Sequence, residues 1–365
     1  MATTATGPRV RVQALRRLIA RLFETFDVPP EDAAIAAEVL VAADLHGVDS
    51  HGTARLTYYV NKLERGLINP QPKIRVAVES PVCSVIDGDN GLGQVVSQFA
   101  MDYCIRRARE VGAACATVGH SNHFGIAGYY ALQAVPHGMI GVALTNASPM
   151  AAPTFGKDKM LGANPIAVAV PADRERSFLL DMSTSAVAAG KLQLAMMAGE
   201  QIPIGWAIDP EGNPTTDPIA GLQGALLPLG STRMTSSHKG YGLAVVVDVL
   251  CALLSGAAWG PQCGGLTRDF NDVSNVGHFF AALRVDAFRP LGEFTAQMDE
   301  MIRGLKTSAL APGEERIYVH GEPEFEEAER RKRDGIPLDP NIAEYLRSLA
   351  AERGLKDELP QFSSD

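Results

Sequence analysis

The spacing of apolar residues changes near residue 74, and this change constrains the fold more than any other feature. Before it, apolar side chains recur at helical intervals, and three helices are expected, over residues 15–28, 31–45 and 53–66. After it, short apolar segments alternate with helical ones. The chain of 365 residues also exceeds the size at which single cores stop growing. We therefore expect a helical N-terminal region over residues 1–73 and an α/β unit over residues 74–322. C-terminal helices over residues 323–365 should pack on the first region.

Within the α/β unit, eight strands and three helices are expected. The strands cover residues 82–86, 113–118, 140–146, 165–170, 178–182, 206–208, 278–285 and 316–319. The helices cover residues 95–111, 126–135 and 241–254. The last of these contains the longest apolar run, which is too short to cross a bilayer and includes Asp248, so we expect a buried helix. A charged helix from residue 323, a loop at 335–337 and a shorter helix should follow.

Composition favours small-molecule chemistry over nucleic-acid or membrane binding. Hydrophobic residues make up 46% and charged residues 21%, as in ordinary globular proteins. The formal net charge of -9 gives no general attraction to nucleic acid or anionic membranes. The five cysteines are odd in number, widely spaced and lack a Cys-x-x-Cys pair, which argues against a disulfide framework or a structural zinc site. A reducing compartment follows, and we expect a cytoplasmic protein.

The N-terminus allows a second interpretation. Its arginines, Arg9, Arg11, Arg16, Arg17 and Arg21, precede the first acidic residue, Glu24, as they would in a mitochondrial presequence. The apolar stripe beside them has helical spacing and continues into the folded chain. We therefore favour a helix docked on the core, with its arginines in solvent.

Two short histidine-containing stretches are the candidate site. Residues 49–55 (DSHGTAR) bring an imidazole, a hydroxyl and a guanidinium close together, and residues 119–125 (GHSNHFG) follow an expected strand. Four of the chain's 8 histidines, His46, His51, His120 and His123, lie in or next to these stretches. Histidine exchanges protons near neutral pH, and arginine binds carboxylates. In isolation each stretch could equally be a turn with a satisfied polar contact.

Common motifs of other enzyme classes are missing. The nearest approach to a dinucleotide fingerprint, Gly91-Leu92-Gly93, lacks the third glycine. The sequence has no Walker loop, Gly-x-Ser-x-Gly elbow or His-Glu-x-x-His helix. A metal-dependent hydrolase stays open, because His120 and His123 with Asp44 or Asp49 could supply ligands.

Five motifs in order resemble a known family. They are ADLHGVDSHG at 43–52, SNHFG at 121–125, LGANP at 161–165, DMSTS at 181–185 followed by Gly190-Lys191, and HKGYGL at 238–243. Together they are similar to the type 2 malate/L-lactate dehydrogenase family, whose relatives include ureidoglycolate dehydrogenase, diketogulonate reductase, sulfolactate dehydrogenase and piperideine-2-carboxylate reductase. The resemblance covers residues 10–340 and is specific because the motifs occur together.

The resemblance implies an α+β fold unrelated to the Rossmann fold. It implies a largely antiparallel sheet wrapped by helices, an N-terminal helical region, binding of NAD or NADP, and a homodimer. His51 would donate or accept the proton, His123 would have a catalytic role, and Arg55 would bind the substrate carboxylate, although alone it could be a surface helix residue. Ser50 and Tyr59 would also contact substrate.

The resemblance also implies a set of cofactor-binding residues. They are His123, Asn164, Asp181, Met182, Ser183, Thr184, Ser185, His238, Lys239, Gly321 and Glu322. Hydroxyls offer donors, and Lys239 could neutralise a phosphate before a helix N-terminus. The serines could instead cap a helix, and Asn164-Pro165 could form a simple turn before a strand.

We therefore expect an NAD(P)-dependent oxidoreductase that interconverts a small 2-hydroxy acid, malate- or lactate-like, and its 2-oxo acid. The first alternative is an NADPH-dependent reductase of cyclic imine carboxylates on the same fold. A metal-dependent hydrolase and a non-catalytic protein of the same fold are the others. The sequence leaves open NAD versus NADP, and which of His51 and His123 transfers the proton.

Overall fold

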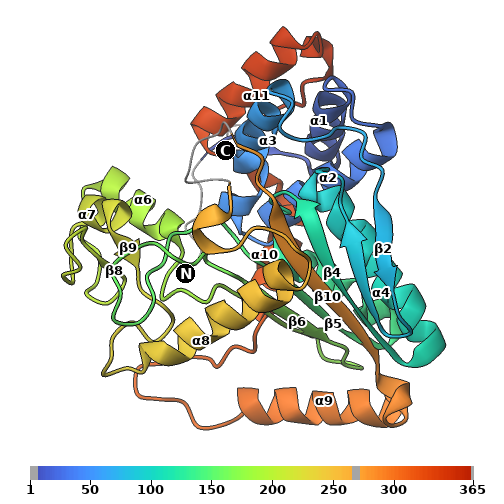
Figure 1. Ribbon diagram of the computed structural model, residues 1–365, viewed down its shortest axis with the longest axis vertical. Helices are drawn as coiled ribbons and strands as arrows, with labels where there is room; N and C mark the ends of the chain where they lie inside the picture. The colour runs from blue at the N-terminus through green and yellow to red at the C-terminus, as the bar shows by residue number, and fades with distance from the viewer. Residues whose placement is uncertain (1–6, 265–271, 363–365) are drawn as a thin grey trace.

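The computed structural model describes residues 7–264 and 272–362 and shows a mixed α+β fold built on an open sheet (Figure 1). The main sheet has seven strands in the order β2-β3-β4-β10-β5-β6-β7. Five of its six strand pairings are antiparallel, and only β3 and β4 run parallel. The strands are β2 (Arg75–Glu79), β3 (Cys83–Asp87), β4 (Ala113–Ser121), β5 (Met139–Thr145), β6 (Ile166–Val170), β7 (Phe178–Met182) and β10 (Val276–Arg284). Two-stranded pairs join β1 (Arg9–Val10) to β11 (Ile336–Pro337) and β8 (Ala207–Ile208) to β9 (Ala225–Leu226).

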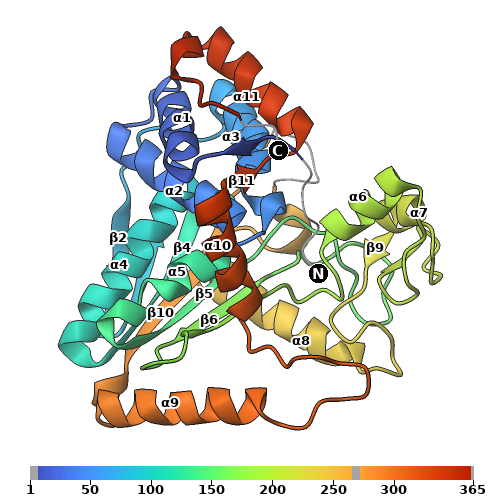
Figure 2. The same ribbon diagram turned by 180° about the vertical axis from the view of Figure 1, so that it is seen from behind.

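Helices cover both faces of this sheet. The helices are α1 (Val12–Glu24), α2 (Pro30–Leu45), α3 (Leu56–Glu64), α4 (Gly93–Val111), α5 (Ala127–Leu132), α6 (Ala189–Ala198), α7 (Pro218–Gln223), α8 (Ser237–Asp248), α9 (Leu291–Lys306), α10 (Glu322–Asp334) and α11 (Pro340–Glu352). Helices α4 and α5 lie on one face, and α8 lies on the other, as the opposite views show (Figures 1 and 2). Small buried residues such as Ala143 and Ala167, which pair in register, let the α4–α5 layer approach the sheet closely.

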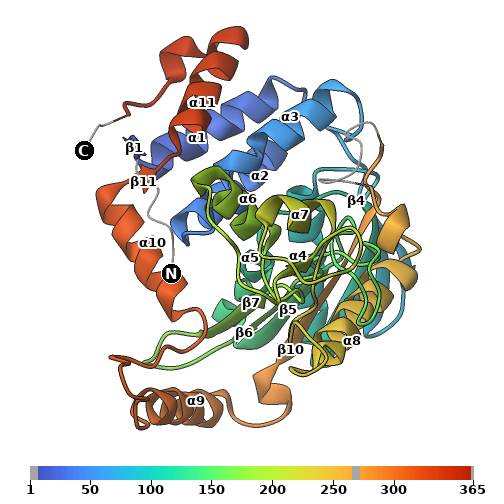
Figure 3. The ribbon, with the colours of Figure 1, turned by 90° about the vertical axis from the view of Figure 1, so that its left-hand side faces the viewer.

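The N-terminal helices form a second apolar core together with the C-terminal helix. The stripe expected from the sequence is buried in it, with Leu15, Ile19, Leu22 and Phe23 all fully inaccessible. Helix α11 lies beside α1 and α3 and contributes Leu346 to the same core (Figure 3). This packing explains the helical period of the first segment, because one face of each helix is covered. The domain boundaries after residues 73 and 322 stay a proposal.

Helix α10 ties the N-terminal helices to the catalytic candidate residues. It runs from the N-terminal layer across the face that carries α5 (Figure 2). The side chain of Arg331 is fully buried, donates to the Asp44 carbonyl oxygen at 2.6 Å, and forms ion pairs with Asp49 and Glu327. A buried guanidinium requires such partners because desolvation of its charge is costly.

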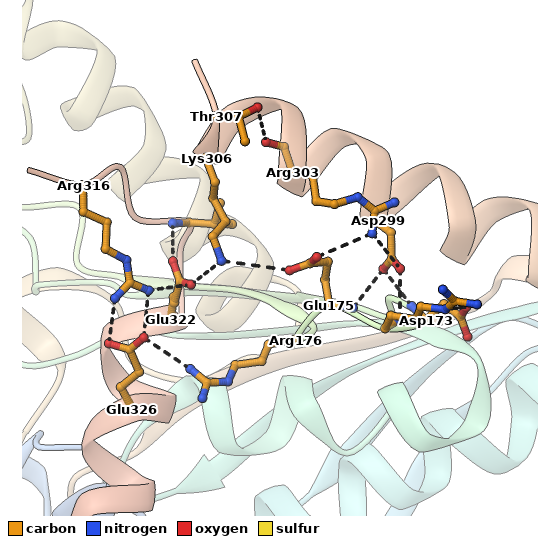
Figure 4. A network of polar contacts seen from close by, with 12 residues as sticks. Asp173, Glu175, Arg176, Asp299, Arg303, Lys306, Thr307, Arg316, Glu322 and Glu326 are labelled. Carbon is orange, nitrogen blue, oxygen red and sulfur yellow. Dashed lines mark hydrogen bonds and ion pairs between the residues drawn. The ribbon is translucent and has the colours of Figure 1, made fainter. Parts of the chain in front are cut away.

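A polar network holds the other end of α10 (Figure 4). The Asp299 carboxylate on α9 accepts hydrogen bonds from the backbone N–H groups of residues 173–175, in the connection between β6 and β7. Lys306 at the end of α9 pairs with Glu322, the first residue of α10, at 2.6 Å. Glu322 also accepts a bond from the Val319 N–H at 3.3 Å, so the network fixes the segment before α10.

Several sequence expectations need correction. No strand forms at residues 316–319, where Arg316 pairs with Glu322 and Glu326 and the segment leads into α10. Strand β2 was missed although Val76 and Val78 alternate with other residues; it is an edge strand whose residues are mostly exposed. Residues 335–337, expected as a loop, include strand β11.

The expected helix at 241–254 forms, but it is not buried. It begins at Ser237, and residues Val249–Leu253 form a π-helical turn. Its inner side covers the sheet through Val247 and Cys251, while Val246 and Leu253 are 50% and 58% exposed. The sequence could not show this, because an apolar run alone does not reveal which sides are covered. Among the described residues, no helix is long and apolar enough to span a membrane.

Replacing Arg331 with leucine should lower the free energy of unfolding by about 3–5 kcal/mol, because Asp49 and the Asp44 carbonyl would lose a buried partner. Arg330→Leu is the matched control. Arg330 neighbours Arg331 and also pairs with Glu327, but its side chain is 32% exposed, so the change should stay within about 1 kcal/mol. Urea unfolding of both variants measures this difference. An equal loss of unfolding free energy in the two variants would show that the burial of Arg331 does not determine its contribution to stability.

Candidate active site

A cavity of about 570 Å³ lies between the N-terminal helices and the ends of the sheet strands. This volume is typical of sites for small ligands and cofactors. The predicted residues that line it are Ser50, His51, Arg55, His123, Asp181, Met182, Ser183 and Gly321. Two sequence stretches about seventy residues apart therefore meet in one place, as expected from their histidines.

A buried carboxylate stabilises the turn that carries His51 and Arg55. Asp44, at the end of α2, accepts hydrogen bonds from the Thr53 backbone N–H at 2.9 Å and from its hydroxyl. A Cβ on Gly52 would lie 1.8 Å from an Asp44 oxygen, so only glycine fits there. Burial raises the pKa of Asp44 to about 7. The turn is thus shaped by contacts behind it, away from the cavity.

His51 and Arg55 are ordered by short-range contacts. The Ser50 hydroxyl lies 2.9 Å from His51 Nδ1, and Arg55 Nε donates to the Ser50 carbonyl oxygen at 2.6 Å. Arg55 also lines the cavity, so its guanidinium is placed to bind an anion there. Burial, followed by the nearby Arg55 charge, lowers the pKa of His51 to about 4. His51 is therefore neutral at physiological pH and can accept a proton.

His123 stacks beside His51, with the ring centroids 5.6 Å apart and the rings 29° from parallel. Its Nδ1 lies 2.6 Å from the Tyr59 hydroxyl and 3.3 Å from the Gly125 backbone nitrogen. Burial lowers the pKa of His123, and the neighbouring His51 and Arg55 lower it further. His120, from the same stretch, points away and contacts Asp87 at 3.0 Å with its side chain 61% exposed.

The opposite wall comes from the ends of β5 and β7. Residues 145–148 follow β5, and Asp181, Met182 and Ser183 end or follow β7. The Asp181 carboxylate accepts a hydrogen bond from the Gly128 N–H at 2.7 Å. Burial, together with the nearby Glu324 charge, raises the pKa of Asp181 to about 6 despite the hydrogen bond from Gly128. This wall combines small, polar and backbone groups. Such groups suit contact with the nicotinamide ring and ribose of the expected cofactor.

Several predicted residues lie outside the cavity lining. Tyr59 is fully buried behind His123, so the geometry gives no support to its expected contact with substrate. Asn164 is buried between loops, where it donates to Asp248 and to the Ala244 carbonyl. The others are Thr184, Ser185, His238, Lys239 and Glu322.

Thr184, Ser185 and Glu322 have other contacts. The Thr184 hydroxyl donates to the Ala163 carbonyl at 3.0 Å, and that of Ser185 donates to the Val187 carbonyl at 2.8 Å. Glu322 belongs to the α9–α10 network. His238 and Lys239 are exposed at the start of α8. Their expected contact with the cofactor stays a prediction.

Sequence reasoning missed other lining residues. They are Tyr58, Asn146, Ser148, His320 and Glu324, while His46, counted in the histidine cluster, also lines the cavity. Tyr58 could have been weighed against Tyr59, because neighbouring helical residues point about 100° apart. Asn146 and Ser148 carry the one usable signal, polar side chains directly after an apolar strand. His46 donates from Nδ1 to the Ala42 carbonyl at 2.8 Å, so its Nε2 is left as an acceptor.

Comparison with known proteins gives the same assignment as the motifs. Residues 10–347 match the family model described as malate/L-lactate dehydrogenase. The chain belongs to the malate/L-lactate dehydrogenase family. It is 44% identical to malate dehydrogenase from Pyrococcus horikoshii, over 95% of this chain and 96% of that protein. It is 41% identical to L-sulfolactate dehydrogenase from Methanocaldococcus jannaschii, over 94% and 96% of the two chains.

Solved structures of family members have the same fold. The Pyrococcus horikoshii malate dehydrogenase structure superposes with a TM-score of 0.88 at 42% identity, covering 97% of this chain and 98% of that one. Delta1-piperideine-2-carboxylate reductase from Pseudomonas syringae pvar. tomato superposes with a TM-score of 0.83 at 27% identity, covering 94% and 99%. Membership in the malate/L-lactate dehydrogenase family thus extends over nearly the whole chain.

The residues present fit a nicotinamide cofactor. The cavity is larger than a small hydroxy acid requires, and Ala163, Ala188 and Gly190 leave room for a flat ring. Asp181 and His46 offer acceptors, and the Ser183 hydroxyl can donate or accept. The cofactor would lie between this wall and the histidines, where it would supply or accept a hydride.

Asn164→Ala should lower the free energy of unfolding by about 1–3 kcal/mol, because Asp248 and the Ala147 N–H would lose buried partners. Lys239→Ala is the exposed comparison and should change stability by less than about 0.5 kcal/mol. Thermal or urea unfolding measures the change in the free energy of unfolding for both variants. An unchanged Asn164→Ala protein would mean that the residue serves the ligand and not the loops.

Proposed function

We propose that this chain is an NAD(P)-dependent dehydrogenase that interconverts a small 2-hydroxy acid and its 2-oxo acid. The observation that carries the proposal is the meeting of His51, His123 and Arg55 in one cavity. Family membership supports the reaction class, since similar proteins are named malate, sulfolactate and ureidoglycolate dehydrogenases. The name of one similar protein specifies NAD(+) and that of another specifies NADP(+). The activity assay should therefore include both cofactors.

The geometry supports a division of tasks among the chain's own residues. Arg55 would hold the substrate carboxylate through two parallel hydrogen bonds and so orient the neighbouring carbinol carbon. His51 would accept the hydroxyl proton, since its low pKa keeps it neutral. NAD or NADP, when bound, takes the hydride. The N-terminal helices and α10 hold these groups in a non-Rossmann site, consistent with the absent fingerprint.

A malate- or lactate-like acid is the first substrate class to test. The closely similar malate and sulfolactate dehydrogenases favour a short acid with a second anionic group. Reduction of a cyclic imine carboxylate is the second candidate, favoured by the structural likeness to the piperideine-carboxylate reductase. The metal-hydrolase alternative gains no support, because no group of three potential metal-ligating side chains occurs within residues 7–264 and 272–362.

The deciding experiment is a panel of oxo acids and cyclic imine carboxylates assayed with NADH and with NADPH. Oxaloacetate or pyruvate should be reduced, and the protein treated with chelator should stay active. His51→Gln should lower kcat by about 10²–10⁴-fold, the usual contribution of a positioned acid or base. The affinity of this variant for NADH should stay unchanged. Inactivity of the wild-type protein on the whole panel would remove the proposal.

The pH dependence of hydroxy acid oxidation should follow His51. The base must be neutral to accept a proton, so oxidation is active above its pKa and declines below it. Because burial and Arg55 bring this pKa to about 4, kcat/KM should show no decline on lowering the pH through 6.5. A stopped-flow or steady-state profile from about pH 5 to pH 8 measures this. A half-maximal point near the ordinary histidine value of about 6.5 would contradict it.

We also propose that the protein is a homodimer in the cytoplasm. The outer side of α8 and its π-helical turn supports a dimer, because it exposes Leu243, Val246, Leu253 and Leu254 side by side. Exposed apolar patches of this kind commonly mark interfaces. All five cysteines are free thiols, which suits a reducing compartment.

Leu253→Glu should convert the dimer to a monomer, because burying a carboxylate against apolar side chains is unfavourable. Leu305→Glu, at a similarly exposed leucine on α9, is the control and should stay dimeric. Light scattering after size-exclusion chromatography should give twice 38.9 kDa for the wild type and 38.9 kDa for Leu253→Glu. A monomeric wild type would refute the assembly.

A further inference from the structure

Tyr59 contacts His123 without lining the cavity, and the contact determines which ring nitrogen carries the proton. The Tyr59 hydroxyl lies 2.6 Å from His123 Nδ1. The Gly125 backbone nitrogen lies 3.3 Å from the same atom. A backbone N–H can only donate, so Nδ1 must accept and carries no proton in this arrangement. The tyrosine hydroxyl then also donates to Nδ1, which at 2.6 Å is nearer to it than its second acceptor, the His123 carbonyl oxygen at 3.4 Å.

The turn after β4 keeps this arrangement in place. Gly125 has a φ of +85°, and a Cβ there would lie 2.6 Å from Val39 Cγ1, so the turn requires glycine. Tyr59 is held on α3, with its ring packed edge-on to Phe23 and Tyr58. Neither donor can withdraw without moving a buried element.

The neutral His123 ring therefore has its proton on Nε2. No hydrogen bond to Nε2 occurs within the part of the chain that the structure describes, and the ring lines the cavity. Such a ring can donate a hydrogen bond to a substrate oxygen but cannot take a proton at Nε2. A neutral imidazole acting as a donor to a carbonyl is a known use of histidine.

His51 has no such constraint. Among residues 7–264 and 272–362, its side chain has one hydrogen-bond partner, the Ser50 hydroxyl, which can either donate or accept, so both tautomers are available. His51 Nε2 can therefore be a bare acceptor. The two histidines, which look equivalent in the sequence, differ in the groups behind them.

We propose that Tyr59 is a positioning residue that keeps the His123 proton on Nε2, so that His123 donates a hydrogen bond to the substrate oxygen while His51 exchanges the proton. The inference rests on the proposed dehydrogenase function. In oxidation, the hydroxyl proton passes to His51 and the hydride leaves the carbinol carbon with the nicotinamide. His123 keeps its own proton throughout.

The charged and titratable groups around His123 favour its neutral state. They are His51 and Arg55 from the 3-10 turns, Tyr58 and Tyr59 from α3, and His278 from β10. None of these is an anion at neutral pH. Hydrogen bonds donated to Nδ1 also stabilise the neutral ring over the cation.

The tautomer can be read directly by NMR. Protein labelled with ¹⁵N-histidine gives long-range ¹H–¹⁵N spectra that distinguish a protonated from a bare ring nitrogen, and His123→Gln identifies the signal among the 8 histidines. The expected result is a bare Nδ1 and protonated Nε2 from about pH 5.5 to pH 8.5. A protonated Nδ1, or a cationic ring in that range, would overturn the proposal.

Tyr59→Phe tests the role of the hydroxyl while keeping the ring contacts. The His123 signal should then show some Nδ1–H form or a higher pKa. The kcat should fall about 10- to 100-fold, as for other hydrogen-bond partners of functional histidines, with NADH affinity unchanged.

Tyr103→Phe is the matched control. Its buried hydroxyl lies between Ser84 at 2.8 Å and Glu79 at 2.9 Å, and the residue does not line the cavity. This variant should leave the His123 signal and the pH profile unchanged. An unaltered His123 signal in Tyr59→Phe would refute the role of Tyr59. Should that variant not fold, the wild-type spectrum still decides the tautomer.

The two proposals fail in different ways. The spectrum needs neither substrate nor turnover, so a panel without activity would remove the dehydrogenase function and leave the tautomer measurement standing. An active enzyme with a protonated His123 Nδ1 would keep the function and reverse the roles of the two histidines.

Discussion

The buried guanidinium of Arg331 is the interaction on which the site depends. It joins α10, almost at the end of the chain, to Asp44 and Asp49 in the stretch that carries His51. Burying a charge of this kind is costly unless it is paired and hydrogen-bonded, and Glu327 supplies a further partner for Arg331. The position of α10 and the shape of the catalytic turn are consequently linked. The α9–α10 network fixes the other end of the helix and the backbone at Gly321 (Figure 4).

Burial then sets the chemistry of the two histidines. Both rings lie in a pocket whose walls are mainly apolar and whose nearest charge is Arg55, so both pKa values fall. A cation beside the cavity serves an anionic substrate and at the same time keeps the imidazoles neutral. The same arrangement that binds a carboxylate therefore prepares a base for its hydroxyl group.

Much of the fold and part of the site could be predicted from the sequence. The buried stripe of α1, the pairing of the two histidine stretches and the end of β7 at Asp181 follow from local period and residue type. The α8 helix shows the limit, because its apolar run predicts a buried helix whether a neighbour covers one side or all of them. Tyr58 and Tyr59 show another limit. They are neighbours on one helix, yet Tyr58 lines the cavity and Tyr59 lies behind His123. Helix boundaries are not known from sequence precisely enough to tell the two positions apart.

The sequence by itself determined the family, the helical and sheet regions, and the residue types that carry the proton and bind the carboxylate, since periodicity and ordered motifs are properties of the chain alone. Only the tertiary structure decided which groups stand behind each histidine. The groups that contact His123 Nδ1 come from α3 and from the turn after β4. The groups that support the segment before and within the His51 turn come from α2 and α10. Such contacts join residues as many as 287 positions apart, and their directions follow from packing, which local sequence does not encode.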